Sequence, residues 1–328
     1  MSEVKKNITV VILTYGGRKY IYQVLEYLKS KKQIRDIVIV SNGLVFSPPN
    51  YIEEYCHVIN NKNNIGSSAG YLLGLDKAKK LNNEFTWLLD DDNLPDEDAL
   101  DELLKVWEKN RFTEAANPVA LQCYRTSQFA FKKFHDNVEL DLLPYRDSFM
   151  CFHFRKLPRM IFNRLNPSLF AKRMNPTLQH ANAAFYGGLF VETKTLLKIP
   201  APNTNYFMYV DDLEFTNNIK KCGGAIFIAS NCVINDLDFS LDLEMKRKIL
   251  YHPLLDFSTN MKAFHYSRNI YHFTKSHLIT NHFVYKINKA IFFCIIKTFS
   301  IIRSKNYRFK VFLSGIRSGA KLYNQSNV

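Results

Sequence analysis

Apolar runs and helix-periodic segments alternate along the first part of the chain. Ile8–Leu13 is a continuous, mostly β-branched apolar run that leads into a Thr-Tyr-Gly-Gly turn, and Ile37–Val40 is a second such run. Runs of this kind are typical of strands buried in a parallel sheet. Between them, Tyr20–Lys29 repeats its apolar residues at the spacing of one helical face. The pattern predicts a strand–helix–strand unit.

The same alternation continues over the first hundred-odd residues. Cys56–Asn60 predicts a third strand, an asparagine-rich loop follows, and Gly66 or Ser67 is expected to begin the next helix. Phe85–Leu89 predicts a further strand, and Pro95 is expected to open a helix because proline is favoured in the first helical turn. This order predicts an α/β fold whose ligand site lies beyond the carboxyl ends of parallel strands.

Three consecutive carboxylates, Asp90, Asp91 and Asp92, follow the strand at Phe85–Leu89. Without a counter-charge they would repel one another. Alternate residues of an extended segment point the same way, so Asp90 and Asp92 can offer hard oxygen ligands to Mg²⁺ or Mn²⁺ bound with a diphosphate. The acidic run Asp96–Asp98 leaves a second interpretation open, namely carboxylates at the positive start of a helix.

A second acidic cluster, Asp211, Asp212 and Glu214, follows an aromatic stretch and precedes a polar segment with helical character. It lies too far along the chain to form a local motif with the first cluster. If both line one cleft, the second can supply a general base for an acceptor hydroxyl while the first holds a metal ion. The start of an ordinary helix is the alternative.

The order and spacing of several motifs resemble family 2 glycosyltransferases of the GT-A fold, and most of all bacterial galactofuranosyl- and rhamnosyltransferases. The resemblance spans roughly residues 8–270. It implies an α/β fold with a Rossmann-like, mostly parallel sheet flanked by helices, followed by a basic helical C-terminal extension. The segments that carry it are TYGGR (Thr14–Arg18), VSNG (Val40–Gly43), NNIGSSAGYLLG (Asn63–Gly74), WLLDDDNLP (Trp87–Pro95), FYGGLFVETKTLLKI (Phe185–Ile199), YVDDLEF (Tyr209–Phe215) and FHYSRN (Phe264–Asn269).

The resemblance also implies roles for single residues. Asp92 becomes the leading ligand of Mn²⁺ or Mg²⁺, with Asp91 second, and Asp212 becomes the general base, with Asp211 positioning hydroxyl groups. The implied reaction is a single displacement on a nucleotide-sugar donor with inversion at the anomeric carbon. The residues implied to bind the donor are Thr14, Tyr15, Arg18, Asn42, Asn64, Gly66, Asp90, Asp91, Gly187 and Gly188.

Two positions depart from the family pattern. Ser41 stands where the second-strand loop of these enzymes commonly has an aspartate. Many relatives also place a histidine ligand after the last strand, whereas this chain has Asn235 and Asp236 there, and either can ligate a metal through oxygen. His252 and His265 are further candidates, although a lone histidine is more often a packing or surface residue.

The net charge of +14 is concentrated at the C-terminal end. Residues 245–328 contain fifteen lysines and arginines and one acidic residue, Asp256, whereas the charges of residues 1–244 balance. A basic segment of this kind favours a polyanionic partner, either nucleic acid or an anionic membrane. We therefore expect a catalytic domain over 1–244, with an aromatic and basic acceptor-side insertion at about 125–180, and a separate region over 245–328.

Within that region, Ala290–Ile302 is an apolar run of thirteen residues broken by Lys297, whereas a bilayer span needs about 20. Lys286, Lys289, Lys297 and Ser300 share one sector of a helical wheel, as in a helix that lies at a membrane interface. The apolar content favours an anionic membrane surface over nucleic acid. A core helix with solvated lysines remains the alternative interpretation.

Six scattered cysteines without C-x-x-C spacing favour a reducing compartment, and the N-terminus does not resemble a secretory signal. We therefore expect a cytoplasmic protein, peripheral on the inner face of the bacterial cytoplasmic membrane. The expected activity is transfer of galactofuranose from UDP-galactofuranose to a lipid-linked saccharide, during synthesis of a surface polysaccharide such as O-antigen or capsule.

Three alternatives to this activity remain. The first alternative is a rhamnosyltransferase whose donor is dTDP-rhamnose. A metal-dependent nucleotidyltransferase or phosphohydrolase would use the same aspartates, but the TYGGR segment supplies only part of a basic, glycine-rich loop and hydrolysis needs no distant acidic base. A non-catalytic membrane scaffold would not need two acidic clusters.

Overall fold

The computed structural model describes residues 7–15, 19–127, 140–158, 177–238 and 253–326. They fall into two compact units. The first contains the described parts of Met1–Leu142, Met174–Phe207 and Asp211–Phe239, and the second contains those of Leu143–Arg173, Met208–Val210 and Ser240–Val328. Residues 128–139 and 159–176 of the expected insertion lie outside the described residues.

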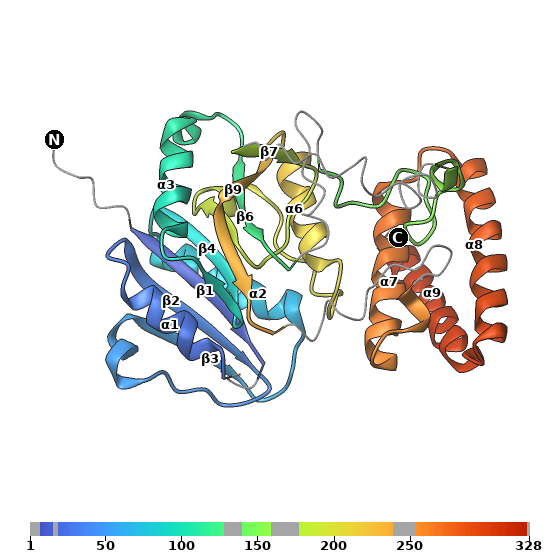
Figure 1. Cartoon of the computed structure of the whole chain (residues 1–328), viewed down its shortest axis with the longest axis horizontal. Helices are drawn as coiled ribbons and strands as arrows, with labels where there is room; N and C mark the ends of the chain where they lie inside the picture. The colour runs from blue at the N-terminus through green and yellow to red at the C-terminus, as the bar shows by residue number, and fades with distance from the viewer. Residues whose placement is uncertain (1–6, 16–18, 128–139, 159–176, 239–252, 327–328) are drawn as a thin grey trace. The chain divides into compact units, whose positions relative to one another are not determined.

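The first unit is built on one sheet (Figure 1). In the part of the chain that the structure describes, the strand order is β3-β2-β1-β4-β8-β6-β9-β5, with β7 paired to β9. The longer pairings, β1 with β2 and β4, β2 with β3, and β6 with β9, are parallel. The strands are β1 (Ile8–Thr14), β2 (Ile34–Asn42), β3 (Cys56–Asn61), β4 (Phe85–Asp90), β5 (Asn93–Pro95), β6 (Val119–Arg125), β7 (Leu178–Ala181), β8 (Leu189–Glu192) and β9 (Ala225–Asp236).

Helices cover both faces of this sheet (Figure 1). The buried apolar residues of α1 and α3 pack with one face, and those of α2 and α6 pack with the other. The two aromatic side chains Trp87 and Trp107 are fully buried on the α3 side. The helices of this unit are α1 (Ile21–Lys29), α2 (Ser67–Leu81), α3 (Ala99–Lys109), α5 (Thr195–Lys198) and α6 (Asp211–Lys221). The expected α/β fold, a mostly parallel sheet between helices, is confirmed.

One predicted element is wrong. Pro95 does not open a helix; it ends β5, in which Asn93 pairs with Asp236 and Pro95 with Ile234 of β9. The helix α3 begins only at Ala99. Proline is compatible with an edge strand because the missing N–H is not needed on the unpaired side. β5 brings the segment after Asp90–Asp92 beside the end of β9, and this pairing shapes the site.

The described residues of the second unit include the long helices α7 (Asn260–His277), α8 (His282–Ile302) and α9 (Asn306–Gln325) (Figure 1). α9 packs closely on α7, because Gly315 and Gly319 face the α7 backbone at Phe264 and Arg268. Among the helices of the described residues, none is both long enough and apolar enough to cross a bilayer. The expected basic helical C-terminal extension is therefore present as a packed helical unit.

α8 has one buried and one exposed face. Its buried positions include Ile296 and Ser300, and Ser300 bonds to the Lys297 carbonyl and to Asn306. Ser300 therefore does not belong to the exposed polar sector that its helical-wheel position predicted. The exposed face instead combines the apolar side chains of Phe283 and Ile302, each 71% exposed, with lysines along its edge.

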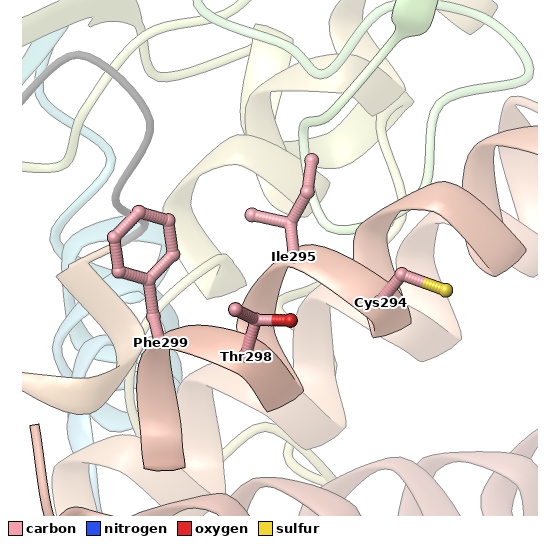
Figure 2. A pocket seen from close by; sticks show the side chains of 4 residues that line it. All are labelled: Cys294, Ile295, Thr298 and Phe299. Carbon is pink, nitrogen blue, oxygen red and sulfur yellow. The ribbon is translucent and has the colours of Figure 1, made fainter. Parts of the chain in front are cut away.

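A hollow of about 250 Å³ lies on the same helix (Figure 2). Cys294, Ile295, Thr298 and Phe299 line it, and their side chains project from successive turns of α8. Cys294 and Thr298 are exposed, and Ile295 and Phe299 are half-buried. α8 thus presents an accessible, mainly apolar surface.

Candidate active site

The aspartate triplet lies where the strand order predicts a ligand site, at the carboxyl end of β4 and beside the end of β1. Thr14, the last residue of β1, donates from Oγ1 to Asp91 Oδ2 at 2.6 Å. The Asp90 backbone N–H donates to Asn93 Oδ1 at 3.0 Å, which bends the chain from β4 into β5. Asp91 and Asp92 are buried, and Asp90 is half-buried.

A buried arginine that sequence reasoning missed neutralises part of this cluster. Arg125, at the end of β6, donates from Nε and Nη2 to Asp236 Oδ1 at 2.9 and 2.6 Å, and from Nη1 to Asp90 Oδ2 at 3.3 Å. Asn93 Nδ2 donates to the same Asp236 oxygen at 2.7 Å. The available signal was an arginine directly after an apolar strand. Only the adjacency of β6, β9 and β5 shows what it pairs with.

Gly187 is the point at which backbone approaches this cluster most closely. A Cβ at Gly187 would overlap Asn93 Oδ1 and Asp90 Oδ2 and would lie 2.6 Å from Arg125 Nη1. Gly188 has a φ of +92°, a left-handed conformation that glycine adopts without steric cost. Gly187 therefore allows the chain to enter β8 against the charged side chains, and the role of the two glycines at the donor stays a prediction.

Gly187→Ala should accordingly displace Asp90 and Arg125 from each other. We expect turnover of the donor to fall about tenfold or more, and the free energy of unfolding to fall by about 1–3 kcal/mol, the usual cost of overpacking. Gly74→Ala is the control for overpacking alone, because a Cβ there would overlap Val11 Cγ1 in the apolar core and φ of Gly74 is not positive. Equal loss of turnover in both variants would show that Gly187 has no special relation to the reaction.

The second acidic cluster begins α6. Asp211 is buried, and its Oδ2 accepts a hydrogen bond of 2.6 Å from Ser67 Oγ, at the start of α2. Asp212 is half-buried, and its Oδ1 accepts the Leu213 backbone N–H at 2.8 Å. The buried carboxylate is thus held by another helix, while its neighbour stays accessible.

Two stacked tyrosines connect the clusters. Tyr71 donates from its hydroxyl to Asp90 Oδ1 at 2.8 Å, and its ring stacks on Tyr186 with centroids 4.1 Å apart. Tyr186 in turn donates to the Asp211 backbone carbonyl at 3.4 Å. The triplet after β4 and the pair that opens α6 therefore lie close together in the fold, although more than a hundred residues separate them in the sequence.

The electrostatics agree with this proximity. Burial is the main cause that raises the pKa of both Asp211 and Asp212, and the charge of Asp90 raises both further. Burial also raises the pKa of Asp92 to about 7, with contributions from Asp90 and Asp236, while Arg125 opposes them. Among the described residues, the site therefore holds more carboxylates than Arg125 offsets, as a cation site would.

Several residues expected at the donor lie at the ends of neighbouring strands: Thr14 ends β1, Asn42 ends β2, and Asn64 and Gly66 lie between β3 and α2. Asn42 Nδ2 donates to Asn64 Oδ1 at 3.1 Å and to the Gly66 carbonyl at 3.0 Å, so these side chains brace the loop before α2. Tyr15 is 55% exposed, beside Gly43. Ser41, where relatives commonly have aspartate, donates to the Leu44 carbonyl. Arg18 lies outside the described residues.

Gly66 is required by the geometry of this loop. Its φ is +86°, and a Cβ there would overlap the Phe207 carbonyl oxygen. The same carbonyl accepts the Ser67 backbone N–H at 2.8 Å. The loop that precedes α2 is therefore locked to the chain that precedes α6.

The candidates for a further metal ligand differ in their partners and in their place in the fold. Asn235 donates to Asp96 Oδ1 at 2.6 Å, and its own oxygen accepts from Thr126, so it is held away from the triplet. Asp236 lies beside Asp92, but Arg125 and Asn93 occupy its Oδ1. His265 belongs to α7 in the second unit, where burial lowers its pKa to about 4. His252 lies outside the described residues.

The carboxylates of the site can supply some, but not all, of the ligands that a divalent ion needs. Among the described residues no three His, Cys, Asp or Glu side chains form a group that could hold a metal by themselves. Mg²⁺ that acts on nucleotides is usually held by one or two carboxylates together with phosphate oxygens. The buried Asp92 and Asp91 offer such oxygens, and their excess negative charge is the feature that a cation would offset.

Comparison with known proteins agrees with the chemistry of the site. Residues 9–165 match the family model described as Glycosyl transferase family 2, which is a little under half of the chain. No curated protein matches the chain in sequence. The family match supports a nucleotide-sugar glycosyltransferase.

Solved structures resemble the chain only distantly. GalNAc-T7 with UDP, GalNAc and Mn²⁺ has a TM-score of 0.49 and 15% identity over 82% of this chain and 48% of its own. S. aureus TarS has a TM-score of 0.46 and 12% identity, over 83% of this chain and 43% of its own. Glucosyl-3-phosphoglycerate synthase from Mycobacterium tuberculosis, with Mn²⁺, UDP-glucose and phosphoglyceric acid, has a TM-score of 0.42 and 11% identity. The match covers 75% of this chain and 77% of that structure's chain. This chain spans less than half the length of the first two, and such distant likeness assigns no substrate.

Proposed function

We propose that the protein is an inverting glycosyltransferase that uses a divalent metal ion and a nucleotide-sugar donor. One observation carries the proposal: the triplet Asp90–Asp92 and the pair Asp211–Asp212 lie in one site, joined through Tyr71 and Tyr186. The family match over residues 9–165 supports the same class of reaction. A phosphohydrolase would have no use for the second carboxylate pair.

In the proposed reaction, Asp212 accepts the proton of an acceptor hydroxyl while that oxygen attacks the anomeric carbon. Its raised pKa suits this task, because a carboxylate with a higher pKa is a stronger base. Ser67 holds Asp211, which orients the hydroxyl groups at the reacting carbon. Asp92 and Asp91 would hold the Mn²⁺ or Mg²⁺ ion, which when bound neutralises the departing nucleotide diphosphate.

The direct test is to incubate the purified full-length chain with Mn²⁺ and each of a panel of nucleotide sugars, and to measure release of the nucleoside diphosphate. We expect release from at least one donor, an increase when a lipid-linked saccharide is added, and loss of both when EDTA removes the metal. Metal-dependent release of inorganic phosphate from the same donors would instead favour a phosphohydrolase.

The finer assignment extends the motif resemblance. We propose UDP-galactofuranose as the donor, with dTDP-rhamnose as the alternative, and a lipid-linked saccharide of bacterial surface polysaccharide synthesis as the acceptor. The Asp90–Asp92 triplet and the YVDDLEF segment at Tyr209–Phe215 support this choice. A panel that contains both donors decides between them by the ratio of their kcat/KM values.

We further propose that the helical unit holds the enzyme at the inner face of the cytoplasmic membrane. Phe283 and Ile302 are strongly exposed on α8, and Lys286 and Lys297 are exposed beside them. An apolar helix face bordered by lysines combines apolar burial with attraction to anionic lipid. The concentration of the net charge in residues 245–328 supports the same partner.

Removal of the chain after about residue 280 should release the protein from anionic liposomes. Because α9 packs on α7, however, a surface variant is the sharper test. We expect Phe283→Glu with Ile302→Glu to weaken binding to anionic liposomes about tenfold or more. Leu197→Glu is the matched control, since Leu197 on α5 is also 71% exposed. Unchanged sedimentation of the double variant with the liposomes would reject the membrane proposal.

A further inference from the structure

The turn that leads into α6 has an unusual backbone. Tyr209 and Val210 have φ values of +64° and +68°, two consecutive left-handed residues, neither of them glycine. For a β-branched residue such as Val210 this conformation is a true outlier, and it persists only where the surroundings hold it. Asp211 follows, so the strained turn ends one residue before Asp212, the candidate base.

One side chain of the second unit holds this turn. Asn269 of α7 is fully buried, and its Nδ2 donates to the Met208 carbonyl at 2.8 Å and to the Tyr209 carbonyl at 3.0 Å. Its Oδ1 accepts from Arg268 Nε at 3.0 Å, which fixes the orientation of the amide. Both of its N–H groups are thus committed to the backbone of the turn.

The residues on either side of the turn are held as well. Phe207, before it, accepts the Ser67 backbone N–H at 2.8 Å, and Asp211, after it, accepts from Ser67 Oγ at 2.6 Å. Three residues thus separate two points that are anchored to the start of α2.

We propose that Asn269 is a positioning residue for the general base. By binding the carbonyl oxygens of Met208 and Tyr209, it keeps Tyr209 and Val210 left-handed and so sets the direction in which the Asp212 carboxylate points. The proposal rests on the proposed function in taking Asp212 as the base. Without the amide, two part-buried carbonyl groups lose their donor and the strained residues can relax.

The first experiment measures the turn without any substrate. Hydrogen–deuterium exchange of the full-length chain should become faster across residues 207–216 in Asn269→Ala, while the strands of the sheet keep their protection. Asn288→Ala is the matched control, because Asn288 is equally buried in the second unit and makes two bonds of 2.8 Å, to Asp147 and Phe154. Equal exchange of 207–216 in the two variants overturns the proposal.

The second experiment measures the reaction. We expect Asn269→Ala to lower kcat about 10- to 100-fold with the donor KM unchanged, since a small displacement of a catalytic group has effects of this size. Asn288→Ala should stay within about threefold of the wild type, the scatter expected of a substitution remote from the reacting groups. A loss of kcat that follows melting temperature in both variants would mark Asn269 as merely structural.

A double variant separates positioning from general destabilisation. Glycine adopts positive φ at little cost, so Val210→Gly removes the strain that Asn269 holds in place. In the Val210→Gly background, Asn269→Ala should therefore lower kcat by less than about tenfold, whereas purely additive effects would contradict the proposal. If the wild type releases no nucleotide from any donor, the proposed function fails, and the exchange comparison still decides whether Asn269 holds the turn.

Discussion

Asp212→Asn is expected to lower kcat for sugar transfer by about 10²- to 10⁴-fold, the usual contribution of a general base. The substitution keeps the shape of the side chain and the oxygen that accepts the Leu213 N–H, but it removes the group that accepts the proton. The donor KM should change little, because Asp212 acts on the acceptor. Initial rates with saturating donor and acceptor measure this effect.

Asp76→Asn is a suitable control for that experiment. Asp76 is an exposed carboxylate on α2 that pairs with Lys79, so its removal tests the loss of one acidic group in the same unit. We expect it to retain full activity. Retention of wild-type kcat by Asp212→Asn would assign the base elsewhere, and the buried Asp211 would then be the next candidate.

Asp92→Asn is expected to abolish metal-dependent transfer, with a loss of about 10³-fold or more in kcat/KM. A bound metal ion supplies several kcal/mol of charge stabilisation to a departing diphosphate, and each 1.36 kcal/mol corresponds to a factor of ten. Titration of the purified variant with Mn²⁺ in the presence of UDP should show much weaker binding by calorimetry. Wild-type affinity for Mn²⁺ would remove Asp92 from the proposed metal site.

The same variant should be more stable than the wild type when no metal is present. Burial and the neighbouring carboxylates raise the pKa of Asp92 to about 7, so the folded state favours the protonated form. The stability that the folded state gains by binding this proton is fully present below about pH 4 and is lost as the pH rises through about 7. Asp92→Asn has no charge to lose, so its advantage should grow from pH 5 to pH 8 and reach about 1–3 kcal/mol, or roughly 3–6 °C in Tm.

Thermal unfolding at several pH values, in EDTA, measures this difference. Addition of Mn²⁺ with UDP should reverse the order, because only the wild type binds the pair tightly and ligand binding stabilises the folded state. An unfavourable, buried carboxylate that becomes favourable on metal binding is the signature of a functional site. If Asp92→Asn is less stable than the wild type at pH 8 without metal, the charge of Asp92 is offset within the protein itself.

Local pattern was enough to predict the first four strands of the sheet. The apolar runs that became β1, β2, β3 and β4 lie where periodicity predicted them, because a strand buried on both faces must be apolar throughout. The two acidic clusters were also visible, since carboxylates directly after an apolar segment are unusual without a role. Pro95 shows the limit: a helix-start signal was outweighed by pairing with β9, a segment far along the chain.

The sequence by itself therefore determined the class of fold, the two acidic clusters that the proposed reaction uses, and the separation of a neutral body from a basic C-terminal region. Only the tertiary structure decided which distant residues meet. Arg125 reaches Asp90, Tyr71 stacks on Tyr186, and Asn269 holds the turn before Asp211. Periodicity reports how each segment is buried, whereas strand order and helix packing determine the partners of its polar side chains, and no local pattern encodes these.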